Sequence, residues 1–495
     1  MKPLIRCIRM SNGCFQMSTT MSYCIQQMRK AFLVVLLTAL AVMKSAARQG
    51  PAADFGIRGF YIDLRNEIMT PAALRAFAGE LAAEGINTLV MEWEATFPYK
   101  NHATISNELA YTREEIASFV GYCSKMGITV IPVQECFGHV EYILRNHRYS
   151  SLREDDKDIS QLCPLKITSD SLLFADLFAD MASLHPSKYI HIGGDETRLL
   201  GHCAECRKKV AAEGASKLFV DYMKTMCNIV LKMGKIPVVW ADMLLKHPEA
   251  AGELPKETIL MDWNYGWKTN YFGNISNLQE KGFTFWGASS VRSHPDNWYV
   301  TDWITHFNNQ KDFIPYARSA GYQGMVTTSW STSGVYSYTW DVGNEVLDME
   351  PIRNNYPLSG FRMLVALYTQ SLKQAAAIDP KAFVVQYAAT RFGLTQKEGA
   401  QLWQALMLPP ELIVQGKPAK SASIAAMRIQ NDSSRKLLNG LHPLKNKNEF
   451  EHYRLMADLR DYYLAYKEIE AEYNAADFSR SNARLLLPKL KRLMD

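Results

Sequence analysis

Eight short apolar runs, separated by amphipathic stretches, lie between residues 57 and 330 of the chain. Most of them are continuously apolar, which is typical of parallel strands buried on both faces. Eight strand–helix units predict an α/β fold, a (β/α)8 TIM barrel, which typically takes about 250 residues. A doubly wound open sheet is the alternative, but no Gly-x-Gly-x-x-Gly follows the first run. The runs are residues 59–64, 86–93, 129–134, 189–192, 236–241, 258–263, 283–288 and 324–329.

Helical stretches with recognisable start signals lie between the runs. Thr70 and Pro71 are an N-cap and a first-turn proline for a helix over residues 71–84. Thr112 and Glu115 form a capping-box pattern for a second helix over residues 112–125. From about residue 345, long helical patterns replace the apolar runs. We therefore predict a barrel over residues 50–344 and a helical C-terminal region over residues 345–495.

The first 49 residues have the order of a secretory signal. Arg29 and Lys30 precede an apolar run over residues 31–43, and the small residues Ser45, Ala46 and Ala47 follow it. The run is shorter than the about 20 residues that span a membrane, so a cleaved leader is favoured over an uncleaved anchor. We expect the protein to be exported to the periplasm, the surface or the medium.

The charges of the chain are nearly balanced, with 55 basic and 50 acidic residues. No basic stripe indicates nucleic acid as a partner. The ten Trp and 24 Tyr residues fit ordinary core packing, and their faces can also stack on sugar rings. Composition does not choose between these two uses.

Six cysteines follow the leader, an even number that permits disulfides without giving their pairing. Cys203 and Cys206, preceded by His202, could begin a zinc site. No second Cys-x-x-Cys or His-x-x-x-His completes a four-ligand set. We therefore expect no metal and no cofactor, with a local disulfide or free thiols at this motif.

Polar residues with catalytic potential recur where the apolar runs end. Barrel active sites form at the C-terminal ends of several strands at once, so the repetition indicates an active site. These residues are Asp63, Arg65, Glu92, Glu94, Glu135, His139, Asp195, Glu196, Trp240, Asp242, Asp262, Trp263 and Trp330.

The most informative stretch is Tyr-Ile-His-Ile-Gly-Gly-Asp-Glu-Thr over residues 189–197. Gly193 and Gly194 permit close approach of the backbone to a ligand or an unusual backbone angle. The adjacent carboxylates of Asp195 and Glu196 should raise each other's pKa by repulsion, which can keep one protonated near neutral pH. The alternative is an ordinary acidic first turn of a helix.

This stretch resembles the His-x-Gly-Gly-Asp-Glu signature of glycoside hydrolase family 20, the β-N-acetylhexosaminidases, and the resemblance extends over about residues 55–335. It implies an exo-acting enzyme that removes terminal β-linked N-acetylhexosamine from glycans with retention of configuration. The sugar's own acetamido oxygen is then the nucleophile. Glu196 is implied as the general acid and base, and Asp195 as the residue that holds the acetamido group.

The resemblance also implies substrate-binding residues. Arg58, in a first-strand motif with Gly59 and Asp63, is expected to hold sugar hydroxyls. His139, which follows Gly138, is expected to form a supporting network near Glu196, oriented by Glu94 or Glu92. An aromatic pocket for the acetamido group is expected from Trp240, Trp263 and Trp330, with Tyr265 as the candidate acetamido-binding tyrosine.

Two departures from the family pattern affect these expectations. Only about ten residues separate the expected cleavage site from the first strand, so we expect no small α/β domain before the barrel. Thr332 stands where many members have a glutamate that binds sugar hydroxyls. The choice between glucosamine-type and galactosamine-type substrates therefore stays open.

Two other classes of function remain as alternatives. One is a catalytically inactive sugar-binding barrel, against which the intact Asp195 and Glu196 argue. The other is a metal-dependent barrel hydrolase that uses His191, Asp195 and His139, although the sequence has no clear four-ligand set for it.

Overall fold

The computed structural model describes residues 55–293, 296, 301–331, 352–353, 356–408, 413–414, 417–418 and 423–494. The expected leader, Thr332 and the expected boundary after residue 344 lie outside these residues. Among the described helices, none is long and apolar enough to cross a membrane.

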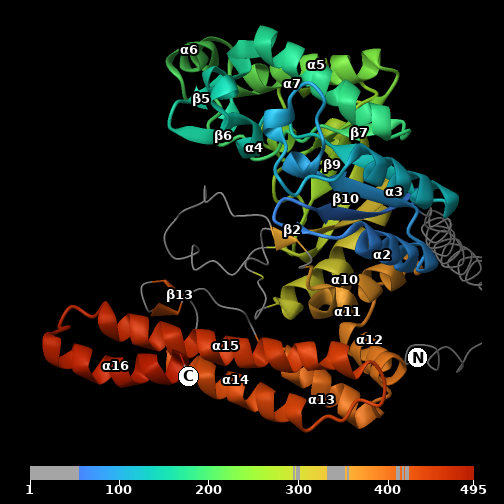
Figure 1. Ribbon diagram of the computed structural model, residues 1–495. Helices are drawn as coiled ribbons and strands as arrows, with labels where there is room; N and C mark the ends of the chain where they lie inside the picture. The colour runs from blue at the N-terminus through green and yellow to red at the C-terminus, as the bar shows by residue number, and fades with distance from the viewer. Residues whose placement is uncertain are drawn as a thin grey trace, which may run out of the picture. The chain divides into compact units, whose positions relative to one another are not determined.

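Eight parallel strands close into a barrel, which confirms the predicted fold (Figure 1). They follow one another around the barrel in chain order, and the last strand pairs with the first. Their C-terminal ends therefore meet on one face, as in all barrels of this kind. The strands are β1 (Ile57–Asp63), β3 (Thr88–Glu92), β4 (Thr129–Val133), β7 (Tyr189–His191), β8 (Ile236–Trp240), β9 (Ile259–Trp263), β10 (Thr284–Arg292) and β11 (Gly324–Ser329).

The inside of the barrel is a packed core. Inward-facing side chains from alternate positions fill it, and aromatic rings occupy much of its volume. Tyr61, Trp240 and Trp286 are almost completely buried there. A second and larger core lies between the strands and the surrounding helices. The functional groups at the strand ends thus stand on a rigid base.

The barrel helices begin where their caps predict. Thr70 Oγ accepts a hydrogen bond from the backbone N–H of Ala73 at the start of α2 (Pro71–Ala83). Thr112 and Glu115 form the predicted capping box of α3 (Arg113–Lys125). Further helices around the barrel are α5 (Ile167–Leu184), α7 (Ala215–Lys232), α8 (Asp242–Lys246), α9 (Ser276–Gln279) and α10 (Trp303–Ser319).

Two segments beside the barrel are longer than a simple strand–helix connection. Between β4 and α5 lie α4 (Glu141–Leu144) and an antiparallel hairpin of β5 (Arg153–Asp155) and β6 (Asp158–Leu162). Between β7 and α7 lies α6 (Ala204–Glu213). The side chains of the two segments meet at the hairpin, as described below.

One helix beyond residue 344 packs directly on the barrel. Helix α11 (Leu358–Leu372) packs on α10 and β10. The buried Tyr368 hydroxyl lies 2.9 Å from Gly59 O and 2.8 Å from Met325 O, on two barrel strands. In addition, β12 (Ile352–Arg353) pairs with β2 (Glu67–Ile68). Helix α11 therefore joins the predicted helical C-terminal region to the barrel.

The rest of the chain is helical, as predicted, apart from the short pair β13 (Ile413–Val414) and β14 (Lys417–Pro418). Helix α15 (Lys447–Tyr473) packs against both α14 (Ile424–Asn439) and α16 (Arg480–Met494) (Figure 1). Ring contacts link the region to α10. The ring centres of Phe307 and Trp403 lie 5.4 Å apart, and those of Trp303 and Tyr453 lie 5.9 Å apart. The helices of the region are α12 (Pro380–Tyr387), α13 (Gln396–Leu406), α14 (Ile424–Asn439), α15 (Lys447–Tyr473) and α16 (Arg480–Met494).

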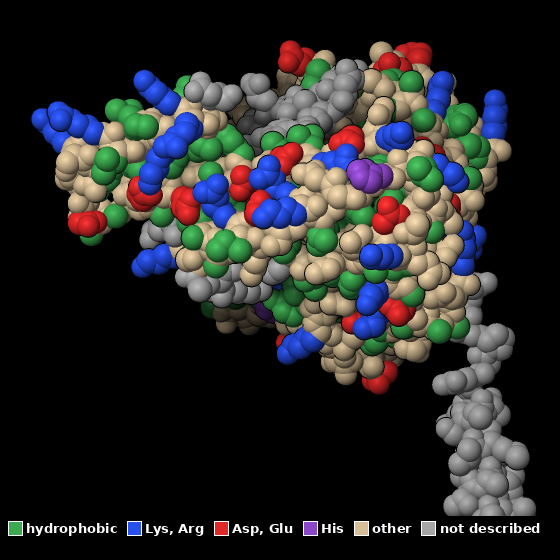
Figure 2. Space-filling model, turned by 90° about the horizontal axis from the view of Figure 1, so that it is seen from below, with side chains coloured by type: hydrophobic (Ala, Val, Ile, Leu, Met, Phe, Trp, Pro, Cys, Tyr) green, Lys and Arg blue, Asp and Glu red, His purple; other side chains and the backbone are tan. Residues whose placement is uncertain are grey.

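The surface agrees with the balanced charge of the sequence. On the face shown in Figure 2, Lys and Arg side chains are interspersed with Asp and Glu. No single-sign stripe covers that face, as a nucleic-acid-binding surface would require.

We predict that Tyr368→Phe destabilises the protein by about 1–3 kcal/mol, because it leaves buried carbonyl oxygens without a donor. Urea unfolding of the purified chain measures this change. Tyr473→Phe is the matched control, because this tyrosine is 62% exposed and its change should be nearly neutral. Equal stability of the two variants would contradict the role of Tyr368 in joining α11 to the barrel.

Candidate active site

The Gly-Gly-Asp-Glu segment after β7 has a glycine at its first position, where any other residue would be both strained and crowded. Gly193 has a φ of +69° and Gly194 a φ of +95°. A Cβ atom on Gly193 would lie 1.5 Å from Glu135 Oε2. The glycine therefore lets the carboxylate that follows β4 lie directly against the strand that carries Asp195 and Glu196.

Three functional side chains stand on strained backbone. Glu94, His139 and Glu196 have φ values of +42°, +52° and +44°. Residues other than glycine rarely adopt such angles, and they persist where the surrounding structure imposes them. Each of the three follows the end of a barrel strand, namely β3, β4 and β7. The strain is thus concentrated on the face where barrel active sites form.

His139 lies between the two adjacent acids. Its Nε2 atom is 3.4 Å from Asp195 Oδ2 and 3.4 Å from Glu196 Oε2. Burial would lower the pKa of His139, but the charge of Asp195 and the hydrogen bonds to both acids raise that pKa well above its usual value. The resting site therefore holds an imidazolium against two carboxylates.

The expectation that repulsion keeps one acid of this pair protonated was wrong for Glu196. A hydrogen bond from His139 outweighs burial and, with the charges of His139 and Arg198, lowers the pKa of Glu196 to about 2. The Arg198 guanidinium lies 3.3 Å from Glu196 Oε2. The sequence analysis considered the repulsion between the acids and omitted the cation that the fold brings between them.

Asp242 supports the same segment from the end of β8. The backbone N–H of Glu196 donates to Asp242 Oδ2 over 3.3 Å, and Lys246 Nζ lies 3.1 Å from the same oxygen. Burial, together with the charge of Asp195, raises the pKa of Asp242 to about 6. The sequence analysis named Asp242 at a strand end but did not include it among the expected site residues.

Buried acids surround this centre. Desolvation raises the pKa of Glu92 to about 7, and it raises those of Glu94 and Glu135 well above their usual value. Glu92 Oε2 accepts a hydrogen bond of 2.9 Å from the Tyr61 hydroxyl. Burial therefore disfavours the charged form of all three acids.

Arg65 is the cation at the ends of β1 and β3. Its guanidinium donates to both carboxylate oxygens of Asp63, and its Nε lies 3.7 Å from Glu92 Oε1. It also lies over the Trp330 ring, 5.4 Å from the ring centre. Asp63 accepts a further hydrogen bond from the backbone N–H of Ser331. This network ties the first, second and last barrel strands together beside the aromatic residues.

The four predicted aromatic residues are brought together. The distances between ring centres are 6.2 Å for Trp240 and Trp330, 6.4 Å for Trp330 and Tyr265, and 5.1 Å for Tyr265 and Trp263. Burial raises the pKa of Tyr265, and the charges of Asp195 and Glu196 raise it further. These rings therefore form a wall close to the acid pair.

Arg58 does not belong to this site, so the prediction that it holds sugar hydroxyls was wrong. It lies near the start of β1, and its guanidinium donates to Phe55 O and Gly85 O at the opposite end of the barrel. A strand advances by about 3.3 Å per residue. Arg58 and Asp63 therefore lie at opposite ends of β1. Arg65 is the arginine that the fold brings to the catalytic face.

The expected partner of His139 also differs from the prediction. Within the described part of the chain, His139 pairs with Asp195 and Glu196 and not with Glu92 or Glu94. Glu94 lies buried on the same face, and its Oε1 atom has no hydrogen-bond partner there. We therefore place Glu94 in the site without the orienting role that was expected.

The described residues contain one cluster with the spacing of metal ligands, and it excludes His191, Asp195 and His139. His191 Nδ1 accepts from the backbone N–H of Gly193 instead. This geometry does not favour the metal-dependent hydrolase that the sequence left open.

An acid pair, a bridging histidine and an aromatic wall thus lie together at one end of the barrel strands. The profile of the glycosyl hydrolase family 20 catalytic domain matches residues 55–342 of the chain. The chain therefore belongs to glycoside hydrolase family 20, whose substrates are glycans that contain N-acetylhexosamine.

Relatives of known class agree with this assignment. Hexosaminidase D from Bos taurus is 27% identical over 50% of this chain and 76% of its own length. Hexosaminidase D from Homo sapiens is 27% identical over 58% of this chain and 62% of its own length. The structure of Flavobacterium johnsoniae chitobiase, at 17% identity, aligns with 89% of this chain and 74% of its own, with a TM-score of 0.50. That last likeness concerns the fold alone.

We predict that Gly193→Ala lowers kcat by about 100-fold, because its Cβ displaces Glu135 and the acids beside it by about an ångström. Gly234→Ala is the control, since Gly234 has a similar φ of +71° but open space around it. Gly234→Ala should lower the free energy of unfolding by only about 1–2 kcal/mol, which is the cost of a left-handed backbone angle for an alanine. Hydrolysis of a chromogenic N-acetylglucosaminide and urea unfolding compare the two. Equal activity of the variants would contradict the close-approach role of Gly193.

We predict that His139 makes stability depend on pH above its ordinary pKa of 6.5. A pKa that is raised in the folded state contributes stability that is complete below pH 6.5 and is lost as pH rises through the raised value. The difference in unfolding free energy between wild type and His139→Gln should therefore shrink as the pH rises above about 6.5. Urea unfolding at a series of pH values measures it, with His147→Gln at an exposed histidine as the control. A difference that stays constant would contradict an imidazolium at His139.

Proposed function

We propose that the protein is an exo-acting β-N-acetylhexosaminidase that uses the substrate's acetamido group as nucleophile and retains the configuration. The observation that carries the proposal is the environment of the two carboxylate oxygens of Asp195. Its Oδ2 atom faces His139, while its Oδ1 atom is buried without a hydrogen-bond partner among the described residues. A buried carboxylate oxygen of this kind can accept the N–H of an acetamido group.

The aromatic wall supplies the other half of an acetamido pocket. Trp240 is almost completely buried, whereas Trp263, Tyr265 and Trp330 are partly exposed. The Trp263 Nε1 atom is buried and has no partner in the described part of the chain. Apolar faces beside a free N–H donor suit a methyl group next to a carbonyl oxygen. In this proposal the rings orient the amide and keep water away from it.

Glu196 acts as the general acid and then as the general base. In the resting protein its carboxyl is ionised and the shared proton lies on His139, 3.4 Å away. Substrate binding removes water from around Glu196, which favours its protonated form. The proton can then pass from His139 to Glu196 and on to the leaving oxygen. Asp195 stabilises the positive charge that develops on the cyclic intermediate.

Arg65 replaces Arg58 in the proposal as the cation nearest the sugar hydroxyls. Its side chain keeps 18% exposure beside Trp330 and is fixed by Asp63. Glucosamine-type and galactosamine-type sugars both belong to the proposed substrate class of terminal β-linked N-acetylhexosamines.

We predict that Glu196→Gln lowers kcat on a chromogenic N-acetylglucosaminide by at least about 100-fold, the lower range for a lost general acid. Asp195→Asn should cause a comparable loss, because it weakens both the hold on the acetamido group and the stabilisation of its positive charge. Steady-state kinetics of the purified chain measure both changes. A leaving group of low pKa should partly restore Glu196→Gln but not Asp195→Asn.

The corresponding plain β-glucoside is the control substrate, and it should be hydrolysed poorly by the wild type. Equal rates on the two substrates would exclude the substrate-assisted mechanism. Binding of the N-acetylated sugar without any turnover by the wild type would instead support the inactive sugar-binding barrel.

A further inference from the structure

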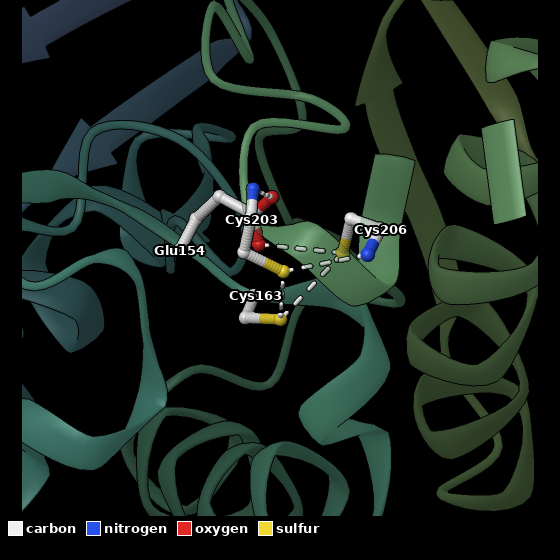
Figure 3. A group of neighbouring side chains, drawn as sticks. All are labelled: Glu154, Cys163, Cys203 and Cys206. Carbon is white, nitrogen blue, oxygen red and sulfur yellow. Dashed lines mark hydrogen bonds between the residues drawn. The ribbon is translucent and has the colours of Figure 1, made fainter. Parts of the chain in front are cut away.

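We propose that Glu154, Cys163, Cys203 and Cys206 form a structural zinc site outside the active site. One ligand atom from each residue lies within 4.8 Å of the others. Figure 3 shows the three sulfur atoms and the carboxylate gathered together. The sequence predicted no metal because it offered only Cys203 and Cys206 close together. The fold adds Cys163 from the end of β6 and Glu154 from β5.

The distances fit a tetrahedral zinc site. Cys163 Sγ lies 3.9 Å from Cys203 Sγ and 3.7 Å from Cys206 Sγ. Four ligands around one zinc ion, with Zn–S bonds of about 2.3 Å, place their sulfur atoms about 3.8 Å apart. A disulfide would require about 2.0 Å and would leave the third thiol unpaired. The spacing therefore matches a shared metal ion better than any pairing of the cysteines.

The surroundings of Glu154 also indicate a missing cation. Glu154 is 3% exposed, and no described Lys, Arg or His forms an ion pair with it. Its Oε1 atom accepts the backbone N–H of Cys203 over 2.8 Å, and its Oε2 atom lies 3.4 Å from Cys206 Sγ. A buried carboxylate without a positive partner is costly. A divalent ion between this carboxylate and the thiolates would supply that partner.

Backbone groups at the start of α6 are placed to support thiolates. Cys203 is the N-cap of this helix, and its sulfur atom accepts the backbone N–H of Cys206 over 3.4 Å. The N-terminal end of a helix stabilises negative charge. His202, which the sequence suggested as a ligand, instead lies 2.9 Å from Asp155 Oδ2 and is about half exposed. The carboxylate of Glu154, and not the imidazole of His202, lies beside the three sulfur atoms.

The type of metal and its role follow from the ligands. Three thiolates select soft metals, and a carboxylate as the fourth ligand favours zinc over copper(I). Four protein ligands leave no open position, which is the mark of a structural site. The site would join the β5–β6 hairpin to the segment that leads from Glu196 into α6. In that segment the backbone N–H of Leu199 also donates to Gln161 of the hairpin.

We predict that the full chain, purified without chelators and with any affinity tag removed, carries about one zinc ion per molecule. Elemental analysis by mass spectrometry measures the metal content. Cys163→Ser and Cys206→Ser should each lose the metal. Cys123→Ser and Cys227→Ser should keep it, because these cysteines are equally buried but lie outside the cluster. Glu154→Gln should weaken binding by at least about tenfold, the range seen when only a supporting residue is lost.

Cobalt(II) provides a second measurement that does not depend on catalysis. The cobalt-loaded chain should show thiolate-to-cobalt charge-transfer absorption and the intense visible bands of tetrahedral cobalt. These bands should be absent when a cluster cysteine is replaced and present in Cys123→Ser. A metal-free chain that takes up neither ion, with three reactive thiols or with a disulfide among Cys163, Cys203 and Cys206, would overturn the proposal. Should a cluster variant fail to fold, the metal content and thiol titration of the wild type still decide.

Discussion

The contact of His139 with two adjacent carboxylates is the interaction on which the catalytic face depends. Asp195 and Glu196 follow each other in the chain, and both lie within 3.4 Å of the same imidazole nitrogen. Without a cation between them, the two charges would repel each other beside the further acids at the strand ends. The strained backbone of His139 and Glu196 is consistent with this demand, because the fold tolerates uncommon angles to bring the three groups together. Gly193 meets the same demand by leaving room for Glu135.

The distribution of protons over the face follows from this arrangement. Burial raises the pKa values of Glu94 and Glu135, which disfavours further negative charge on this face. Arg65 beside Asp63 lowers the pKa of that carboxyl despite its burial. At the centre, the raised pKa of His139 and the lowered pKa of Glu196 favour a proton on the imidazole, within reach of Glu196. In the proposed mechanism this is the proton that the general acid needs, and it is held on a neighbouring residue rather than on the acid itself.

The sequence predicted the parts of the molecule that depend on local patterns. The eight apolar runs, the caps at Thr70 and Thr112, and the Gly-Gly-Asp-Glu segment all appear where they were expected. The sequence did not predict the position of a side chain where that position depends on which end of a strand it occupies, or on which distant segments the fold brings beside it. Arg58 lies near the start of β1 and Arg65 follows its end, and a motif alone does not tell which of the two ends faces the site.

The cysteine cluster shows the same limit most clearly, and it also connects the two sites. Cys203 and Cys206 are neighbours in sequence, but Cys163 and Glu154 come from a hairpin some 40 or more residues earlier. Only the fold brings them together. The segment from Glu196 to Cys203 is anchored at one end by Asp242 and His139, and at the other end by the cluster. A metal ion there would add a further bond between this segment and the hairpin. Because placement of a catalytic group to within about an ångström decides its rate, the rigidity of this segment contributes to the position of Glu196.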